Sequence, residues 1–325
     1  MVKAYWIGID GGGTKTTAVI GNCSGQIIAK YYGESGNLTA ISIEQLYERL
    51  NDIIEHLLMK ANVEMDSVEI IFAALAGADR ISEQKKIYQA FQQSPIFDKL
   101  RVQSDVHAAL ATGTWGREGT LMIAGTGSII FGWHQDKSFR IGGWGYLLGD
   151  EGSGYHLGKL ALRSILRAYD QNLKLKPFQE EILNYFEMKS PPEIITTIYS
   201  SPNPVTIISS ISKIVLTAYK EDDSAKEIIS IIHGELLHLI ELAYDRIDFT
   251  KPLVLHGGLF SNELFYSEFV NRVSLKFSNL YVTKPHVIGA VGAYILALLE
   301  NDIAIDDEVK QNIQLTWHQL EGEVK

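Results

Sequence analysis

The stretch Asp10-Gly11-Gly12-Gly13-Thr14-Lys15-Thr16 decides the fold. It lies between two apolar runs, Tyr5–Ile9 and Thr17–Gly21, and strand, glycine turn and strand in this order predict a β-hairpin. Three glycines let backbone N–H groups turn toward a phosphate, because no Cβ stands in the way. Asp10 comes at the strand end, where it could hold Mg²⁺ through water. The spacing is not that of a Walker loop, and the alternative is a plain hairpin turn.

The same pattern recurs at Gly125-Thr126-Gly127-Ser128, between the apolar runs Thr120–Ala124 and Ile129–Trp133. One hairpin of small residues is ordinary, but two in matching contexts are what a phosphate clamp requires. The recurrence also predicts two similar lobes, each of which opens with a strand–turn–strand unit.

The alternation of strand-like and helix-like segments favours an α/β protein. Further strands are expected at Gln26–Tyr32, Val68–Leu75, Leu100–Gln103 and Lys251–His256. Ser42 and Gln45 resemble a capping box at the start of a helix.

The second half of the chain reads mostly as helices from Tyr155 to Arg246, with a loop expected at Ser190–Pro204. Another helix is expected after Ser261, and Val287–Leu299 is expected to be the last buried helix. The residues from Asn301 onward are polar and are expected to form a peripheral tail.

Composition excludes several classes of protein. The chain has 325 residues, a length that suggests two domains, with 46% hydrophobic and 21% charged residues, as in globular proteins. Its net charge of −10 works against non-specific binding to nucleic acid. The single cysteine, Cys23, excludes an internal disulfide and a cysteine-held zinc or iron–sulfur site, and it fits a reducing cytoplasm. The longest uncharged apolar run, Val287–Leu299, is shorter than the about 20 residues of a membrane helix.

Asp105 is the candidate catalytic group, because it follows a predicted strand in Gln103-Ser104-Asp105-Val106-His107. A carboxylate there could accept the proton of an attacking hydroxyl. The alternative is that Asp105 caps a helix that begins at Val106, and both roles can hold at once. His107 is expected inside that helix, as a surface or core residue.

Glycine-rich segments mark a candidate site for a hydroxyl-rich ligand. The block Gly142-Gly143-Trp144-Gly145 is followed by Gly149-Asp150-Glu151-Gly152-Ser153-Gly154, a carboxylate pair among small residues. Trp144 could instead pack under the loop. Asn37 could offer its amide to a sugar hydroxyl, or could be a left-handed turn residue. In His256-Gly257-Gly258, the glycines would let a flat base lie against the backbone.

This ordered set resembles the N-acetylglucosamine kinase family of BadF/BadG/BcrA/BcrD-type ATPases, in the actin/hexokinase/Hsp70 superfamily. Ile9–Thr14 looks like the first phosphate motif of that family, Gly125–Ser128 like the second, and Leu255–Gly258 like its adenosine motif. Asp105 falls where the family keeps its catalytic aspartate. The glycine block and Asn37 match the family's pocket for N-acetylglucosamine.

The resemblance implies a fold of two RNase H-like α/β lobes around a central cleft. Residues 1–116 would form the first lobe, with helix 287–299 packing back toward it, residues 117–286 the second lobe, and residues 301–325 a peripheral tail. The implied ligands are ATP, Mg²⁺ held by Asp10 and a small-molecule sugar. The protein would be a cytoplasmic homodimer that binds neither nucleic acid nor a membrane.

The resemblance also implies the residues of the site, with Asp105 as the catalytic residue. The implied sugar-binding residues are Asn37, Asp105, Thr126, Gly127, Gly143, Asp150 and Gly154. The implied ATP-binding residues are Gly11, Gly12, Gly13, Thr14, Lys15, Thr16, Gly125, Thr126, Gly127, Ser128, Gly257 and Gly258.

The implied reaction is phosphorylation of the 6-hydroxyl of N-acetylglucosamine. Leu38 and Thr39 depart from the polar and aromatic neighbours that the animal enzymes carry after Asn37. The resemblance therefore does not decide whether the pocket accepts an N-acetyl group. Glucosamine, N-acetylmuramic acid or another hexose is the alternative substrate. An ATP-driven switch protein without a sugar substrate is the alternative class, although the activators of that kind use cysteines that this chain lacks.

Overall fold

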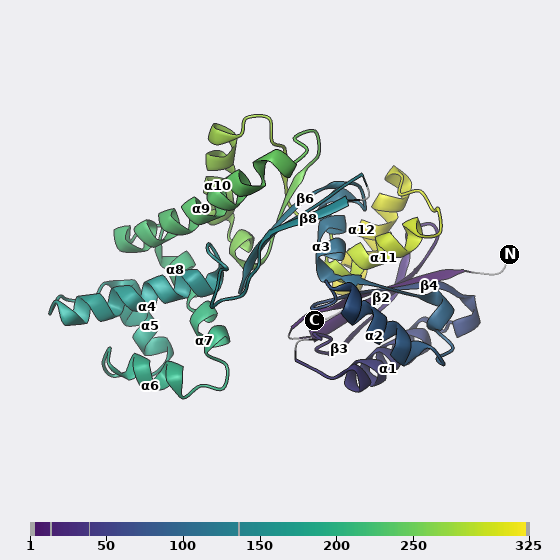
Figure 1. Ribbon diagram of the computed structural model, residues 1–325, viewed down its shortest axis with the longest axis horizontal. Helices are drawn as coiled ribbons and strands as arrows, with labels where there is room; N and C mark the ends of the chain where they lie inside the picture. Colours follow the sequence, from purple (N-terminus) through teal and green to yellow (C-terminus); the bar gives the residue numbers. More distant parts are fainter. Residues whose placement is uncertain (1–3, 14, 39, 136, 323–325) are drawn as a thin grey trace. The chain divides into compact units, whose positions relative to one another are not determined.

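The chain divides into two compact units in the computed structural model, which describes residues 4–13, 15–38, 40–135 and 137–322 (Figure 1). The first unit comprises Met1–Arg117 and Lys284–Lys325, and the second is the continuous segment Glu118–Thr283. Within the described ranges, no helix is both long and apolar enough to span a membrane.

The first unit is built on a five-stranded sheet whose strand order is β3-β2-β1-β4-β5. The strands are β1 (Tyr5–Gly11), β2 (Lys15–Asn22), β3 (Ile27–Glu34), β4 (Val68–Leu75) and β5 (Leu100–Ser104). The first three pair antiparallel, and β4 and β5 continue the sheet parallel to β1. All five expected strands of this unit are therefore confirmed, and the first glycine stretch forms the turn between β1 and β2.

Helices cover both faces of this sheet (Figure 1). The helices are α1 (Ile43–Ala61), α2 (Ile81–Phe91), α3 (Asp105–Thr114), α11 (Gly289–Leu299) and α12 (Asp307–Gly322). Ile7 and Ile9 face the core formed with α1 and α2, whereas Trp6 faces the core formed with α3, α11 and α12. This alternation along β1 is the period of two that a strand buried on both faces must show.

The close approach of α11 to β1 depends on Gly8. A Cβ on Gly8 would lie 2.1 Å from the backbone nitrogen of Tyr294, so any side chain there would push the helix off the strand. Gly292 has the same role toward α3, since its Cβ would lie 2.2 Å from the carbonyl oxygen of Ala108. The returning segment is thus part of the first unit's core.

The second unit repeats the sheet of the first. Its strands are β6 (Gly119–Ala124), β7 (Ser128–His134), β8 (Lys137–Gly142), β9 (Leu253–His256) and β10 (Val282–Thr283). Their order is β10-β9-β6-β7-β8, with β6, β7 and β8 antiparallel and with β9 and β10 parallel to β6. Read from β8, this is the order of the first sheet, which confirms the prediction of two similar units.

Most of the second unit outside its sheet is helical, as expected. The helices are α4 (Gly154–Asp170), α5 (Pro177–Tyr185), α6 (Glu193–Tyr199), α7 (Pro204–Ser210), α8 (Ser212–Ala218), α9 (Asp223–Ala243) and α10 (Glu263–Lys276). The largest apolar cluster of the unit joins these helices to the buried side chains of β6, β7 and β9.

Two sequence expectations were wrong. The stretch Ser190–Pro204 is not one loop, because α6 lies inside it. The prolines that suggested a loop stand at helix starts: Pro192 directly precedes α6, and Pro204 is the first residue of α7. The residues after Asn301 do not form a peripheral tail, because α12 buries Val309, Ile313 and Trp317, three residues spaced to share one helix face.

Candidate functional site

The first group of candidate residues lies at the carboxyl ends of β1 and β5. Asp10 and Gly11 close β1, and Asp105 is the first residue of α3, directly after β5. The amide of Ala76, after β4, donates to the carbonyl of Gly11 over 2.9 Å, and the amide of Leu38 donates to the carbonyl of Ala76 over 3.0 Å. The structure thus ties the glycine turn to the segment that carries Asn37, at the edge of a parallel sheet where ligands commonly bind.

Asp10 and Asp105 form an electrostatically strained pair. Burial, and then the nearby carboxylate of Asp105, raise the pKa of Asp10 to about 6, although Lys15 opposes the change. Burial also raises the pKa of Asp105, against hydrogen bonds from the Ser104 hydroxyl and from backbone amides. Two neighbouring, partly buried carboxylates with raised pKa values are typical of a site that receives a cation or a proton.

The amino terminus of α11 lies against Asp10. A Cβ on Gly289, the first residue of that helix, would lie 2.1 Å from Oδ2 of Asp10. Glycine is therefore required there, and the carboxylate faces the positive end of the helix dipole. No motif in the sequence indicates this contact, because the two residues lie at opposite ends of the chain.

The predicted helix cap at Asp105 is shifted by one residue. Ser104 occupies the cap position but makes no capping hydrogen bond with its side chain, and its hydroxyl donates instead to Oδ1 of Asp105 over 3.2 Å. Asp105 stands in the first turn of α3, where a negative charge is favourable. His107 lies inside the same helix, as expected, and burial lowers its pKa.

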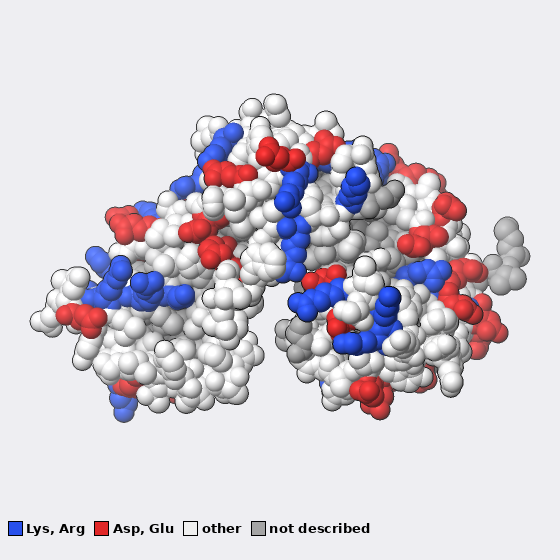
Figure 2. All heavy atoms as spheres, in the orientation of Figure 1, with Lys and Arg blue, Asp and Glu red and all other residues white. Residues whose placement is uncertain are grey.

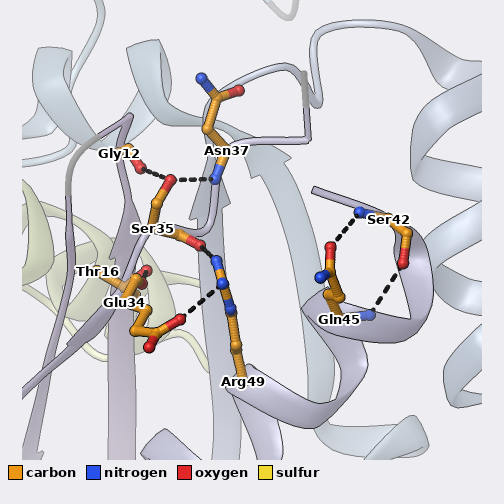
Figure 3. A network of polar contacts seen from close by, with 8 residues as sticks. All are labelled: Gly12, Thr16, Glu34, Ser35, Asn37, Ser42, Gln45 and Arg49. Carbon is orange, nitrogen blue, oxygen red and sulfur yellow. Dashed lines mark hydrogen bonds and ion pairs between the residues drawn. The ribbon is translucent and has the colours of Figure 1, made fainter. Parts of the chain in front are cut away.

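Ser35 links the turn of the first hairpin to Asn37 (Figure 3). Its hydroxyl donates to the carbonyl of Gly12 over 3.0 Å and accepts from the amide of Asn37 at 3.3 Å. The φ of Asn37 is not positive, so the interpretation of Asn37 as a left-handed turn residue is wrong. A Cβ on Gly13 would lie 3.7 Å from Nδ2 of Asn37, which places the side-chain amide of Asn37 beside the turn.

Arg49, which was not among the predicted site residues, holds this segment from α1. Its guanidinium donates to the carbonyl of Ser35 and forms an ion pair with Glu34 at 2.6 Å (Figure 3). A signal was present, because Arg49 has the helical spacing of Leu46, Leu50 and Ile53 and is a charged residue on an otherwise apolar face.

The groups of the first turn differ in whether they are free to meet a ligand. The amide of Gly12 donates to the carbonyl of Lys15 over 3.1 Å, and the hydroxyl of Thr16, which is buried, donates to the carbonyl of Glu34 over 2.6 Å. Both donors are therefore used within the fold. The Gly13 amide has no partner among the residues that the structure describes, and it is the donor left for a phosphate. The predicted contribution of Thr14 lies outside those residues.

The second group of candidate residues lies around the turn Gly125–Ser128 in the second unit. The amide of Gly125 donates to the carbonyl of Gly127 over 2.9 Å, and the amide of Gly154 donates to the carbonyl of Gly125 over 2.7 Å. The hydroxyl of Ser128 is used in a 2.6 Å hydrogen bond to the carbonyl of Glu151. The start of α4 is thereby fixed to the turn, while the amides of Thr126 and Gly127 have no backbone partner within the described segments.

Asp150 is held against this turn. A Cβ on Gly127 would lie 2.7 Å from Oδ2 of Asp150, so the glycine makes room for the carboxylate. Burial raises the pKa of Asp150, and hydrogen bonds from the amides of Ser128 and Gly145 partly offset that effect. The backbone of Asp150 has a φ of 62°, an uncommon conformation for a residue other than glycine. Such an enforced conformation is typical of functional sites.

The glycine block around Asp150 supports a loop that exposes Trp144. Trp144 does not pack under the loop, because 67% of its surface is exposed and its ring lies 5.1 Å from the guanidinium carbon of Arg140. Gly143 has a φ of 68°, which favours glycine. Ser153 caps α4 by accepting from the amide of His156 at 3.1 Å.

The two glycines after β9 have different surroundings. Gly257 has a φ of 107°, and its Cβ would lie 2.5 Å from the carbonyl oxygen of Ala124, so it is required for packing against β6. Gly258 has open space where a Cβ would be. Of the predicted pair, Gly258 is the one with room for a flat ligand.

The residues present fit a Mg²⁺ ion held with phosphates. Throughout the described ranges, no group of three or more His, Cys, Asp or Glu side chains could hold a metal by itself. Mg²⁺ commonly binds through one or two carboxylates, with water and substrate phosphates completing its shell. Asp10, which is costly to ionise beside Asp105, provides a carboxylate of that kind.

Two sheets of the same strand order, each with a glycine turn after its first strand, define an α/β protein of the actin-like ATPase fold. A solved structure from Chromobacterium violaceum, provisionally assigned as an N-acetylglucosamine kinase, has this fold. It matches with a TM-score of 0.72 at 23% identity, over 92% of this chain and all of that one.

The chain belongs to the BadF/BadG/BcrA/BcrD ATPase family, whose sequence profile matches residues 7–297. It is 31% identical over 304 residues to the N-acetylmuramic acid/N-acetylglucosamine kinase of Clostridium acetobutylicum, covering 92% of this chain and 99% of that protein. It is 26% identical over 318 residues to the N-acetyl-D-glucosamine kinase of Dictyostelium discoideum, again covering 92% and 99%.

Proposed function

We propose that this protein is an ATP-dependent kinase that phosphorylates the 6-hydroxyl of N-acetylglucosamine, giving N-acetylglucosamine 6-phosphate and ADP. The observation that carries the proposal is the partly buried carboxylate of Asp105, which lies near Asp10. Desolvation raises the pKa of Asp105. The similarity to sugar kinases of two organisms over nearly the whole chain supports the choice of an amino sugar.

Asp105 acts as the general base in this proposal. The 6-oxygen of the sugar forms a bond to the γ-phosphorus, the bond from that phosphorus to the bridging oxygen breaks, and ADP leaves with the electron pair. The proton of the sugar hydroxyl passes to the carboxylate of Asp105. A raised pKa makes this carboxylate a better proton acceptor than an exposed aspartate, and general-base assistance is typically worth about 10²- to 10⁴-fold in rate.

Backbone donors of each unit bind phosphate oxygens. The first unit offers the amide of Gly13, and the second offers those of Thr126 and Gly127. Asp10 would hold Mg²⁺, which when bound neutralises charge on the phosphates. Gly258 leaves space for the adenine ring. Positioning and charge stabilisation by such preorganised groups account for most of the catalysis in phosphoryl transfer.

Asn37 and Asp150 bind sugar hydroxyls in this proposal. The backbone amide of Asn37 donates to the hydroxyl of Ser35, which holds the residue that carries the side-chain amide beside the turn. Asp150 accepts hydrogen bonds when it is ionised, and the amides of Ser128 and Gly145 hold its carboxylate in place. ATP phosphates are anionic, so Asp150 suits the sugar better than the nucleotide.

A coupled assay of ADP release across a panel of sugars tests the proposal. The panel contains N-acetylglucosamine, N-acetylmuramic acid, glucosamine and glucose, and we expect the highest kcat/KM for N-acetylglucosamine. A higher value for another sugar would overturn the substrate assignment. ATP turnover that no sugar stimulates would overturn the kinase assignment and favour a switch ATPase.

Calorimetric titration of the Asp150→Ala variant tests the role of that residue. Loss of a charge-assisted hydrogen bond should weaken sugar binding by about 10- to 100-fold and leave Mg-ATP binding nearly unchanged. The opposite pattern would assign Asp150 to the nucleotide. The cytoplasmic location and the homodimer that the family resemblance implies belong to the same proposal, and sedimentation at micromolar concentration tests the dimer.

A further inference from the structure

A basic cavity that is open to solvent lies among the helices of the second unit, and none of the residues proposed for catalysis lines it. Its volume is about 380 Å³, which falls in the range of pockets for small molecules. Its walls come from α4, from the connection between α4 and α5, from α5 and from α9. Four cations line it: Arg163, Arg167, Lys174 and Lys176.

The charge of this cavity runs against that of the whole chain. The chain carries a net charge of −10, whereas the cavity has four cations and one carboxylate, that of Glu227. Figure 2 shows Lys and Arg side chains gathered over α4. Arg163 and Arg167 are four residues apart on one helix, so they project from the same face and repel each other.

These cations have no ion-pair partner among the residues that the structure describes. Lys176 contributes to lowering the pKa of Asp223, but the carboxylate of Asp223 already binds Lys226 at 2.7 Å. Lys226 lowers the pKa of Asp223 more than Lys176 does. All four side chains are exposed to solvent, so the positive charge of the cavity is accessible to an anionic ligand.

A fixed polar network backs the cavity. Gln179 is 4% exposed; its Nε2 donates to the hydroxyl of Ser164 over 2.9 Å, and its Oε1 accepts from the amide of Lys176 at 2.9 Å. The hydroxyl of Ser164 in turn donates to the carbonyl of Ala161 over 2.7 Å. The backbone that carries Lys176 is thus fastened to α4, which keeps cations of the loop and of the helix together without a ligand.

We propose that this cavity binds a small phosphorylated metabolite at a site separate from the catalytic residues. The arginines offer planar, paired donors that suit a phosphate group, and the lysines add charge. The apolar side chains of Leu160, Ile228 and Ile231 leave room for a neutral organic part of the ligand. This inference does not depend on the kinase assignment.

Hydrogen–deuterium exchange on the full-length protein tests the proposal, because it localises binding even if phosphates also occupy the catalytic residues. The probes are inorganic phosphate, pyrophosphate and N-acetylglucosamine 6-phosphate, each compared with sodium chloride at equal ionic strength. We expect slower exchange in peptides that cover residues 163–179 and 224–231. If N-acetylglucosamine 6-phosphate protects these peptides most strongly, the site binds a phosphate ester. If inorganic phosphate protects them equally well, the site binds the free anion.

The double variant Arg163→Gln/Arg167→Gln should weaken this protection by at least about tenfold in probe concentration, because each arginine contributes charge-assisted hydrogen bonds. Both side chains are exposed and form no ion pair within the described segments, so the variant should fold. The matched control Lys189→Gln/Lys213→Gln removes the same charge from exposed residues outside the cavity. No protection by any probe, or equal loss in the control, would overturn the proposal.

Discussion

Replacing Asp10 by Asn should stabilise the protein at neutral pH while it removes most of the activity. The carboxylate of Asp10 is costly to ionise, because it is buried and lies near Asp105, and these causes raise its pKa from 3.8 to about 6. Asn keeps the shape of the side chain but carries no charge. A residue whose replacement stabilises the fold and abolishes turnover is one that is kept for function.

The size and the sign of the effect follow from the pKa of Asp10. A tenfold change in an acid dissociation constant corresponds to about 1.4 kcal/mol, so the free energy of unfolding should rise by up to about 3 kcal/mol. Partial exposure and the lost attraction to the start of α11, about 0.3–1 kcal/mol, reduce the expected gain to about 1–2 kcal/mol. Between pH 3.8 and 6 the folded state holds the proton that the unfolded state releases. Wild-type stability therefore falls, through this group, as the pH rises across that window.

Thermal and urea unfolding of the Asp10→Asn variant at pH 4.0, 5.0 and 7.5 measures this dependence. The gain over wild type should be small at pH 4.0 and reach its full value by pH 7.5. The matched control is Asp98→Asn, which neutralises an exposed carboxylate of the same unit and should show little gain at any pH. A destabilised variant at pH 7.5, or a gain that does not change with pH, would refute the reasoning.

Four further variants test the two units. Asp105→Asn should keep sugar and ATP affinity and lose about 10²- to 10⁴-fold in kcat, whereas turnover within threefold of wild type would leave it a purely structural role. Gly13→Val should raise the KM for ATP with little change in Tm, because its Cβ would make only an ordinary contact of 3.7 Å, with Nδ2 of Asn37. Gly127→Val should lower the Tm, because its Cβ would meet a carboxylate oxygen of Asp150 at 2.7 Å; equal Tm values would contradict this contrast. Ser35→Ala removes two hydrogen bonds and should raise the KM for sugar several-fold with kcat less affected, and an unchanged KM would show that the segment holds its place without them.

Local patterns in the sequence were sufficient to predict the five strands of the first sheet, three strands of the second sheet and both glycine turns, but not β8 and β10. Apolar runs separated by glycine fix a hairpin within a few residues, and the capping box of Ser42 and Gln45 is present with both of its hydrogen bonds. The helix at 307–322 was missed because most of its residues are polar, although three apolar residues recur at every fourth position.

Contacts between distant segments could not be predicted in the same way. The close approach of Gly289 to Asp10 depends on tertiary packing, as does the close approach of Asp150 to Gly127. The sequence also could not show that the hydroxyls of Thr16 and Ser128 are used within the fold, because a threonine or serine beside a glycine turn looks the same whether or not a carbonyl lies in reach.

The return of α11 to the first sheet sets an order on folding during synthesis. The apolar face that β1 and β4 present to α11 is not covered until the ribosome has made residues 289–299. The second unit is continuous, so all its strands are available earlier. Domains of many proteins fold from the amino terminus as they emerge. Here the unit that is made first finishes last, and until then it exposes the side chains of Trp6, Ile70 and Phe72.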